Sequence, residues 1–321
     1  MRFVVIGAGA IGGVVGARLA QAGRGVVLVA RGAHYERIAA AGLTLETPLE
    51  RVTLPMRVFP APATVDFGDD DVVLLATKSQ DTIAALAPVR EAAPAGTPIV
   101  CLQNGVENER MALRMFPDVY GALVMAPTAH LEPGVVQAYG AKLTGQIDLG
   151  RWPGSIDDRC RAVCEVLTAA RFGSEPRADI MRLKYAKLVQ NLANAVQAIC
   201  GDDPGAGALA ERVREEGRVV MRAASIEFGD DHVSDLEGRW ASWGVGDISG
   251  RPRAGGSTWQ SVVRGAGSIE TDYLNGEIVL EGRLVGVPTP VNALLQSLAQ
   301  ETVREHRQPG WLSADEVLAR V

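Results

Sequence analysis

The first thirty residues hold the pattern that most constrains the fold. An apolar run, RFVVI at residues 2–6, is followed directly by the glycine-rich segment GAGAIGG and then by an Ala- and Leu-rich stretch that ends near Gly23. A second apolar run covers residues 26–30. Strand, glycine turn, helix and strand within about 30 residues indicate a βαβ unit, whose parallel strands are apolar throughout because helices cover both faces of such a sheet. The chain is therefore expected to begin with an α/β fold built on a parallel sheet.

The glycine-rich segment has the spacing GxGxxG, formed by Gly7, Ala8, Gly9, Ala10, Ile11 and Gly12. In such a turn the first glycine permits the tight bend, the second lets the backbone approach a pyrophosphate, and the third lets the helix pack closely on the strand. The N-terminus of the following helix offers N–H groups and the positive end of its dipole to phosphates. The pattern alone is weak, but its place between a strand and a helix predicts that these six residues bind a dinucleotide.

The ends of three strands suggest which cofactor is bound. An NAD enzyme usually carries Asp or Glu after the second strand, to bind the ribose 2′-hydroxyl. Here the sequence is VARG at residues 29–32, so no acid is present, and the guanidinium of Arg31 can pair with a 2′-phosphate. Lys78 is a second candidate for the phosphates, and Asn104 for the ribose or the nicotinamide amide. We expect NADPH, with solvated side chains or a turn cap as the alternative roles of these residues.

Length and patterning predict two domains. The chain has 321 residues, against a prior of roughly 150 per domain. Strand-like runs at 71–76, 98–102 and 121–126 extend the sheet, and short pieces between 127 and 150 suggest an antiparallel edge. Helical patterns then follow at 157–170, 180–200, 208–228, 270–286 and 291–306. We expect a Rossmann-like dinucleotide-binding domain over residues 1–177 and an all-helical C-terminal domain over residues 178–321.

Composition excludes several classes of function. The net charge of −6 argues against a basic surface that would hold nucleic acid. No apolar run reaches the roughly 18 residues that a membrane span needs, and the N-terminus has no charged leader, so a cytoplasmic protein is expected. The four cysteines form no CxxC and the four histidines no HxH or HExxH, so no metal site is expected. A homodimer is compatible with a helical second domain, although the sequence does not decide it.

A polar stripe on the helix expected over residues 180–200 suggests catalysis. Lys187, Asn191 and Asn194 fall at i, i+4 and i+7, so they share one face among apolar neighbours. Asparagine is a poor helix former, so two of them here require a reason. A ketone reductase must supply a proton to the developing alkoxide, and a lysine beside the carbonyl can do so. Lys187 fits this role, with Lys184 as its competitor and a solvated surface helix as the alternative.

Six segments together give the chain a resemblance to a known family. They are MRFVVIGAGAIGG, LATKSQDT, CLQNGVENE, AKLVQNLANA, GGSTWQS and SIETDYLNGEIV. Because they occur in the same order over nearly the whole chain, the sequence resembles the ketopantoate reductase family. The resemblance implies a Rossmann-like domain that binds NADPH and a helical domain that supplies a catalytic lysine. It also implies reduction of a 2-ketoacid, with ketopantoate to pantoate, in pantothenate biosynthesis, as the named reaction.

The same resemblance implies roles for individual residues. Lys187 would donate the proton, and Asn191 would orient this lysine or the substrate. Asn104, in the QNG segment, would lie near the substrate. Ser257 and Glu270 would contact the carboxylate and hydroxyl of the substrate, although Glu270 could instead stabilise a helix N-terminus.

Departures from the family pattern keep alternatives open. The family's second helix asparagine falls one residue further on, where this chain has Ala195, so Asn194 is a substrate-binding candidate for which the family's role stays open. The segment from Gln260 to Glu270 is one residue longer, and GGSTW replaces an asparagine-containing run. The alternatives are therefore a reductase of a different 2-ketoacid and a catalytically silent NADP-binding sensor.

Overall fold

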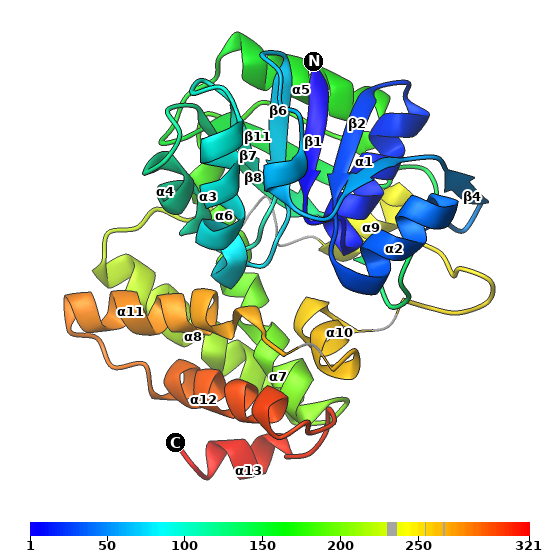
Figure 1. Ribbon diagram of the computed structural model, residues 1–321. Coiled ribbons are helices and arrows are strands. Elements are labelled where there is room, and N and C mark those ends of the chain that lie inside the picture. Colours follow the sequence, from blue (N-terminus) through cyan, green and yellow to red (C-terminus); the bar gives the residue numbers. More distant parts are fainter. Residues whose placement is uncertain (230–235, 254, 266) are drawn as a thin grey trace. The chain divides into compact units, whose positions relative to one another are not determined.

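The computed structural model, shown in Figure 1, describes residues 1–229, 236–253, 255–265 and 267–321. By compactness, the described residues divide into two units. The first unit comprises residues 1–103, 107–181 and 236–253, and the second comprises the rest. The expected boundary between residues 177 and 178 concerns independently folding domains and stays a prediction.

A large, mainly parallel sheet forms the first unit. Within the described residues its strand order is β12-β11-β8-β7-β6-β1-β2-β5. The parallel strands are β5 (Arg57–Phe59), β2 (Gly25–Val29), β1 (Arg2–Ile6), β6 (Asp71–Leu75), β7 (Ile99–Cys101) and β8 (Val119–Met125). β11 (Gly145–Arg151) runs antiparallel to β8, and β12 (Phe172–Gly173) pairs with β11. This is the doubly wound order of dinucleotide-binding folds, which confirms the Rossmann-like fold class.

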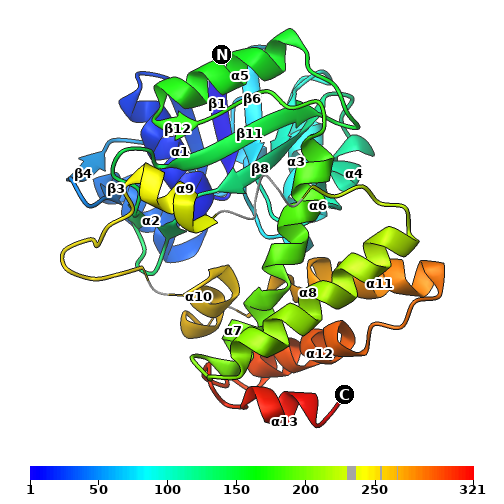
Figure 2. The same cartoon turned by 180° about the vertical axis from the view of Figure 1, so that it is seen from behind.

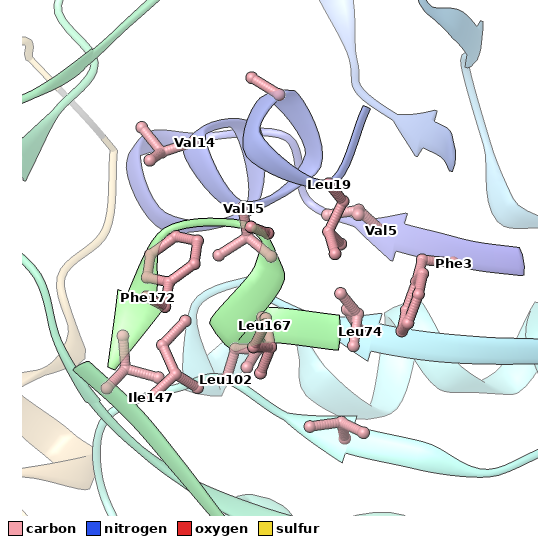
Figure 3. Packing of buried hydrophobic residues seen from close by; sticks show 14 of the residues in the cluster. Phe3, Val5, Val14, Val15, Leu19, Leu74, Leu102, Ile147, Leu167 and Phe172 are labelled. Carbon is pink, nitrogen blue, oxygen red and sulfur yellow. The ribbon is translucent and has the colours of Figure 1, made fainter. Parts of the chain in front are cut away.

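The alternation of side chains along β1 explains why this strand is apolar throughout. Phe3 and Val5 belong to one buried cluster, and Val4 and Ile6 to another. The first cluster includes side chains of α1 (Ala10–Gln21) and α5 (Asp158–Ala169), and the second includes those of α3 (Thr82–Ala92) and α4 (Asn108–Leu113). Successive side chains of a strand point to opposite faces, so helices on both faces require an apolar residue at every position. Figure 3 shows Phe3 and Val5 packed with Leu19 of α1.

A small second sheet lies beside the large one in the first unit. Its order is β4-β3-β10-β9, formed by β4 (Arg51–Leu54), β3 (Leu43–Glu46), β10 (Val135–Ala138) and β9 (Thr128–Ala129). The antiparallel edge expected over residues 127–150 is confirmed by the β9–β10 and β8–β11 pairs. The sequence did not predict that β10 also pairs in parallel with β3.

The helices complete both units. In the first unit, α2 (Gly32–Ala41) follows β2, and α9 (Leu236–Trp243) joins from a distant part of the sequence; α5 and α9 are both visible in Figure 2. The second unit contains α7 (Ala193–Cys200), α8 (Ala206–Ala223), α10 (Ser257–Val263), the 3-10 helix η3 (Glu270–Tyr273), α11 (Asn275–Val285), α12 (Pro290–Arg304) and α13 (Ala314–Leu318). Its described residues form helices and no strand, as expected. Across the described chain, no helix combines the length and apolar character needed to cross a membrane.

The helix expected over residues 180–200 is divided in two. α6 (Ile180–Asn191) and α7 are separated by Leu192 alone, which keeps helical dihedral angles (φ −56°, ψ −33°) and donates its N–H to the carbonyl of Leu188 over 3.1 Å, so helix covers the expected residues with an irregularity at Leu192. The amide Nδ2 of Asn275 donates to the backbone oxygen of Leu192 over 3.2 Å. A side chain that binds a helix carbonyl in this way competes with the helical hydrogen-bond ladder and accounts for the local irregularity at Leu192. Lys187 and Asn191 belong to α6, and Asn194 belongs to the start of α7, just beyond Leu192.

Candidate active site

Each glycine of the turn between β1 and α1 meets a different steric requirement. Gly7 has φ of +99°, and a Cβ there would lie 2.9 Å from backbone atoms of Ala76 and Thr77. A Cβ on Gly12 would overlap the carbonyl oxygen of Gly7. A Cβ on Gly9 would meet no atom within 4 Å, so the backbone there is open to an approaching group. Tight bend, open approach and close packing are the features that a pyrophosphate-binding turn needs, so these residues fit a dinucleotide.

The loops that carry Arg31 and Lys78 lie at the carboxyl edge of the sheet, as the glycine turn does. β1 lies between β2 and β6, and the strand order reverses at this point, where α/β sheets bind their ligands. Arg31 directly precedes α2, its side chain is 77% exposed, and its guanidinium lies 3.9 Å from the carboxylate of Asp81. Lys78 follows β6 and precedes the 3-10 helix η2 (Ser79–Asp81). Arg31 is thus exposed near the predicted phosphate site, and Lys78 belongs to a loop at the same edge.

The glycine turn gives the first testable prediction. Gly9→Ala is expected to fold normally but to raise the Kd for NADPH by at least about tenfold, roughly 1.4 kcal/mol, because the new methyl group occupies the open approach. Gly12→Ala is expected to lower the free energy of unfolding by about 1–3 kcal/mol, because its methyl group overlaps the backbone. Fluorescence titration with NADPH and thermal unfolding measure the two effects. Equal loss of stability in both variants would contradict the assignment.

Three of the expected catalytic residues come together in the second unit. The Nζ of Lys187 donates a hydrogen bond of 2.8 Å to Oδ1 of Asn104. Burial and, to a smaller extent, the positive charge of Lys184 lower the pKa of Lys187 to about 7, against the opposing effect of the negative charge of Glu270. Glu270 is 7% exposed and begins η3. The site therefore holds an amine that exchanges its proton near neutral pH, beside an amide oxygen that fixes its direction.

The expected substrate-binding residues surround α7 and the start of α10. The Nδ2 atom of Asn191 is buried and has no hydrogen-bond partner within the described part of the chain. The Oδ1 of Asn194 lies 3.4 Å from the point where a Cβ would stand on Gly256. Ser257 follows as the first residue of α10. Asn194 thus lies close to Gly256, the residue before Ser257, and Asn191 is the last residue of α6.

Two polar residues acquire importance that the sequence did not give them. Lys184, interpreted as a flanking residue, is 3% exposed, and its charge lowers the pKa of Lys187. Its spacing of one helical turn from Lys187 was the available signal. Gln197 accepts a hydrogen bond of 2.7 Å from the backbone N–H of Gly256. The sequence could not predict this contact, because it joins segments far apart in the chain.

A doubly wound sheet with this turn, followed by a helical unit with a lysine of lowered pKa, defines a dinucleotide-dependent oxidoreductase. The family model for ketopantoate reductase PanE/ApbA matches residues 3–154, and that for the ketopantoate reductase PanE/ApbA C-terminal region matches residues 179–303. The chain therefore belongs to the ketopantoate reductase family, which confirms the resemblance found in the sequence.

Individual relatives agree with this placement. A 2-dehydropantoate 2-reductase of Mesorhizobium japonicum is 30% identical, over 94% of this chain and 98% of the relative. That of Pyrococcus horikoshii is 29% identical, over 94% of this chain and 97% of the relative. The crystal structure of a PanE/ApbA family ketopantoate reductase from Ralstonia eutropha JMP134 matches with a TM-score of 0.80 and 29% identity, over 96% of this chain and all of that one. D-mandelate dehydrogenase, solved with NADH and anilino(oxo)acetate, shares the fold with a TM-score of 0.81 at 21% identity, over 95% of this chain and 99% of that one.

Proposed function

We propose that this protein reduces 2-dehydropantoate (ketopantoate) to pantoate with NADPH, and that Lys187 donates the proton. The observation that carries the proposal is the amine of Lys187, held 2.8 Å from the amide oxygen of Asn104, with a pKa lowered to about 7. A general acid is most effective when its pKa lies near the working pH. The names of relatives that match this chain over nine-tenths of its length or more support the choice of substrate.

The residues of the chain then divide the work. The bound cofactor supplies the hydride that adds to the ketone carbon. The residues of the glycine turn, Gly7 to Gly12, hold the pyrophosphate, and Arg31 and Lys78 bind phosphate groups. Their N–H groups and cations would offset the negative charges of a bound cofactor.

The residues that bind and protonate the substrate belong to the second unit. Lys187 gives its proton to the ketone oxygen as the alkoxide develops, and its positive charge stabilises that oxygen beforehand. Asn104 accepts a hydrogen bond from the lysine and fixes the direction of the amine, and its place in the QNG loop also suits contact with the nicotinamide end of the cofactor. Glu270, Ser257 and Asn191 bind the hydroxyl and carboxylate of the substrate, and Asn194 lies beside Ser257.

The decisive test is the consumption of NADPH with ketopantoate and with a panel of other 2-ketoacids, each repeated with NADH. Turnover of ketopantoate with a preference for NADPH is expected. Turnover only with other 2-ketoacids would support a reductase but would show that ketopantoate is not its substrate. Tight NADPH binding without turnover of any ketoacid would favour the sensor and overturn the proposal.

Arg31 provides a prediction for cofactor choice. Arg31→Ala is expected to raise the KM for NADPH by about tenfold and to leave the KM for NADH unchanged, because only NADPH carries the 2′-phosphate. The matched control is Arg24→Ala, since Arg24 is another exposed arginine but lies before β2, at the opposite end of that strand. An equal rise in the KM for NADPH and the KM for NADH would show that Arg31 does not bind the 2′-phosphate. The cytoplasmic location and the possible homodimer stay predictions.

A further inference from the structure

A chain of buried side-chain hydrogen bonds crosses the carboxyl edge of the large sheet. The Nε2 of Gln103 donates to the hydroxyl of Thr82 over 2.7 Å, and this hydroxyl donates to Oδ1 of Asn108 over 2.8 Å. The Nδ2 of Asn108 then donates to the hydroxyl of Ser79 over 3.1 Å, and Gln103 also reaches the hydroxyl of Thr77 over 3.4 Å. The donors all run in one sense from Gln103 to Ser79, so each bond supports the next.

The burial of this chain makes its bonds hard to replace. Thr82 and Asn108 are fully buried, Ser79 is 1% exposed and Gln103 is 5% exposed. Water has little access at such depth, so a hydrogen bond lost from this network is costly to replace. The Thr82 hydroxyl joins Gln103 to Asn108, because it accepts from the first and donates to the second.

The residues joined by these hydrogen bonds flank, in the sequence, two residues to which the proposed function gives a role. Thr77 and Ser79 stand on either side of Lys78 in the sequence. Gln103 and Asn108 stand at the two ends of the segment that carries Asn104. A single hydroxyl, that of Thr82 at the start of α3, therefore joins both ends of the Asn104 segment and, through Asn108, the loop of Lys78.

We propose that Thr82 is a positioning residue, whose hydroxyl fixes the loops that present Lys78 to the cofactor and Asn104 to Lys187. This inference rests on the proposed function for the roles of Lys78 and Asn104. It adds a residue that touches neither substrate nor cofactor. Loss of the hydroxyl releases both loops together, so it changes cofactor affinity and turnover in the same variant.

Thr82→Val and Thr82→Ser form the central pair of variants. Valine keeps the shape of threonine and removes the hydroxyl, whereas serine keeps the hydroxyl and removes a methyl group. Thr82→Val is expected to weaken NADPH binding and to lower kcat, each on the order of tenfold, below the roughly hundredfold loss that a misplacement of about 1 Å can cause. Thr82→Ser is expected to recover most of both losses.

Thr97→Val is the matched control. Thr97 is a buried threonine, 3% exposed, that precedes β7 at the other end of that strand, and its hydroxyl has no hydrogen-bond partner among the described residues. The control variant is expected to match the wild type in Kd, kcat and thermal unfolding. A loss in Thr82→Val that Thr97→Val shares would show a general effect of threonine replacement and would overturn the inference.

Two readouts separate this inference from the proposed function. NADPH affinity is measured by fluorescence titration and needs no substrate, and kcat is measured with ketopantoate. If the wild type turns over no ketoacid, the proposed function fails, while weaker NADPH binding in Thr82→Val with recovery in Thr82→Ser still supports the fixed Lys78 loop. If the wild type is active and Thr82→Val equals it in both readouts, the inference fails alone. Should Thr82→Val not fold, Ser79→Ala removes the hydroxyl that accepts from Asn108 at the outer end of the network, and unchanged NADPH affinity in that variant would overturn the inference.

Discussion

Lys187→Ala is expected to lower kcat with ketopantoate by about 10²- to 10⁴-fold, the range that a positioned general acid contributes. The variant loses the amine that lies 2.8 Å from Asn104 and whose pKa is about 7, so the developing alkoxide must take its proton from water. Steady-state kinetics at saturating NADPH and ketopantoate measure the effect. The Kd for NADPH, measured by fluorescence titration, is expected to stay within about twofold of the wild type, because the glycine turn is untouched.

Lys142→Ala is the control for the loss of a lysine. Lys142 is exposed and belongs to the first unit, so this variant is expected to keep the kcat of the wild type. Retained turnover in Lys187→Ala would show that Lys187 is not the proton donor. Loss of NADPH binding together with turnover would indicate a damaged fold instead of a missing acid, and thermal unfolding of the variant would distinguish these outcomes.

Local patterns predicted the elements of the dinucleotide-binding half well. The run RFVVI, the glycine turn and the helix after it lie where the sequence placed them, because a buried parallel strand and a phosphate-binding turn have strong local signatures. The strands expected at 71–76 and 98–102 agree with β6 and β7 to within a residue or so at each end. The small second sheet was not predicted, because β3 pairs with β10 from about ninety residues away and nothing local encodes that pairing.

The candidate site was less accessible to sequence patterns for the same reason. The stripe of Lys187, Asn191 and Asn194 assumed a regular helix, and the irregularity at Leu192 involves a hydrogen bond from Asn275, more than eighty residues further on. The contact between Lys187 and Asn104 likewise joins distant segments. Helical spacing could identify the polar residues and their chemistry, but only the tertiary structure shows which of them meet.

The turnover number is expected to fall at alkaline pH because Lys187 acts as an acid only in its ammonium form. Its pKa of about 7 implies that the protonated fraction decreases by about tenfold for each pH unit above that value, and so by about 100-fold at pH 9. Below pH 6 the ammonium form dominates, and kcat should reach a plateau. The measurement is kcat for ketopantoate from about pH 5 to about pH 9.5 at saturating NADPH.

Lys184→Met tests whether the fall of kcat at alkaline pH reports the titration of Lys187. The charge of Lys184 lowers the pKa of Lys187, so its removal raises that pKa and moves the falling limb of kcat to higher pH. Methionine keeps much of the volume of this buried side chain, and Lys142→Met removes an exposed lysine as the matched control, for which no shift is expected. If the fall of kcat in Lys184→Met stays at the same pH or moves to lower pH, the group that titrates is not Lys187. A shift to higher pH in this variant alone would connect Lys184 and Lys187 to the proton that the reaction consumes.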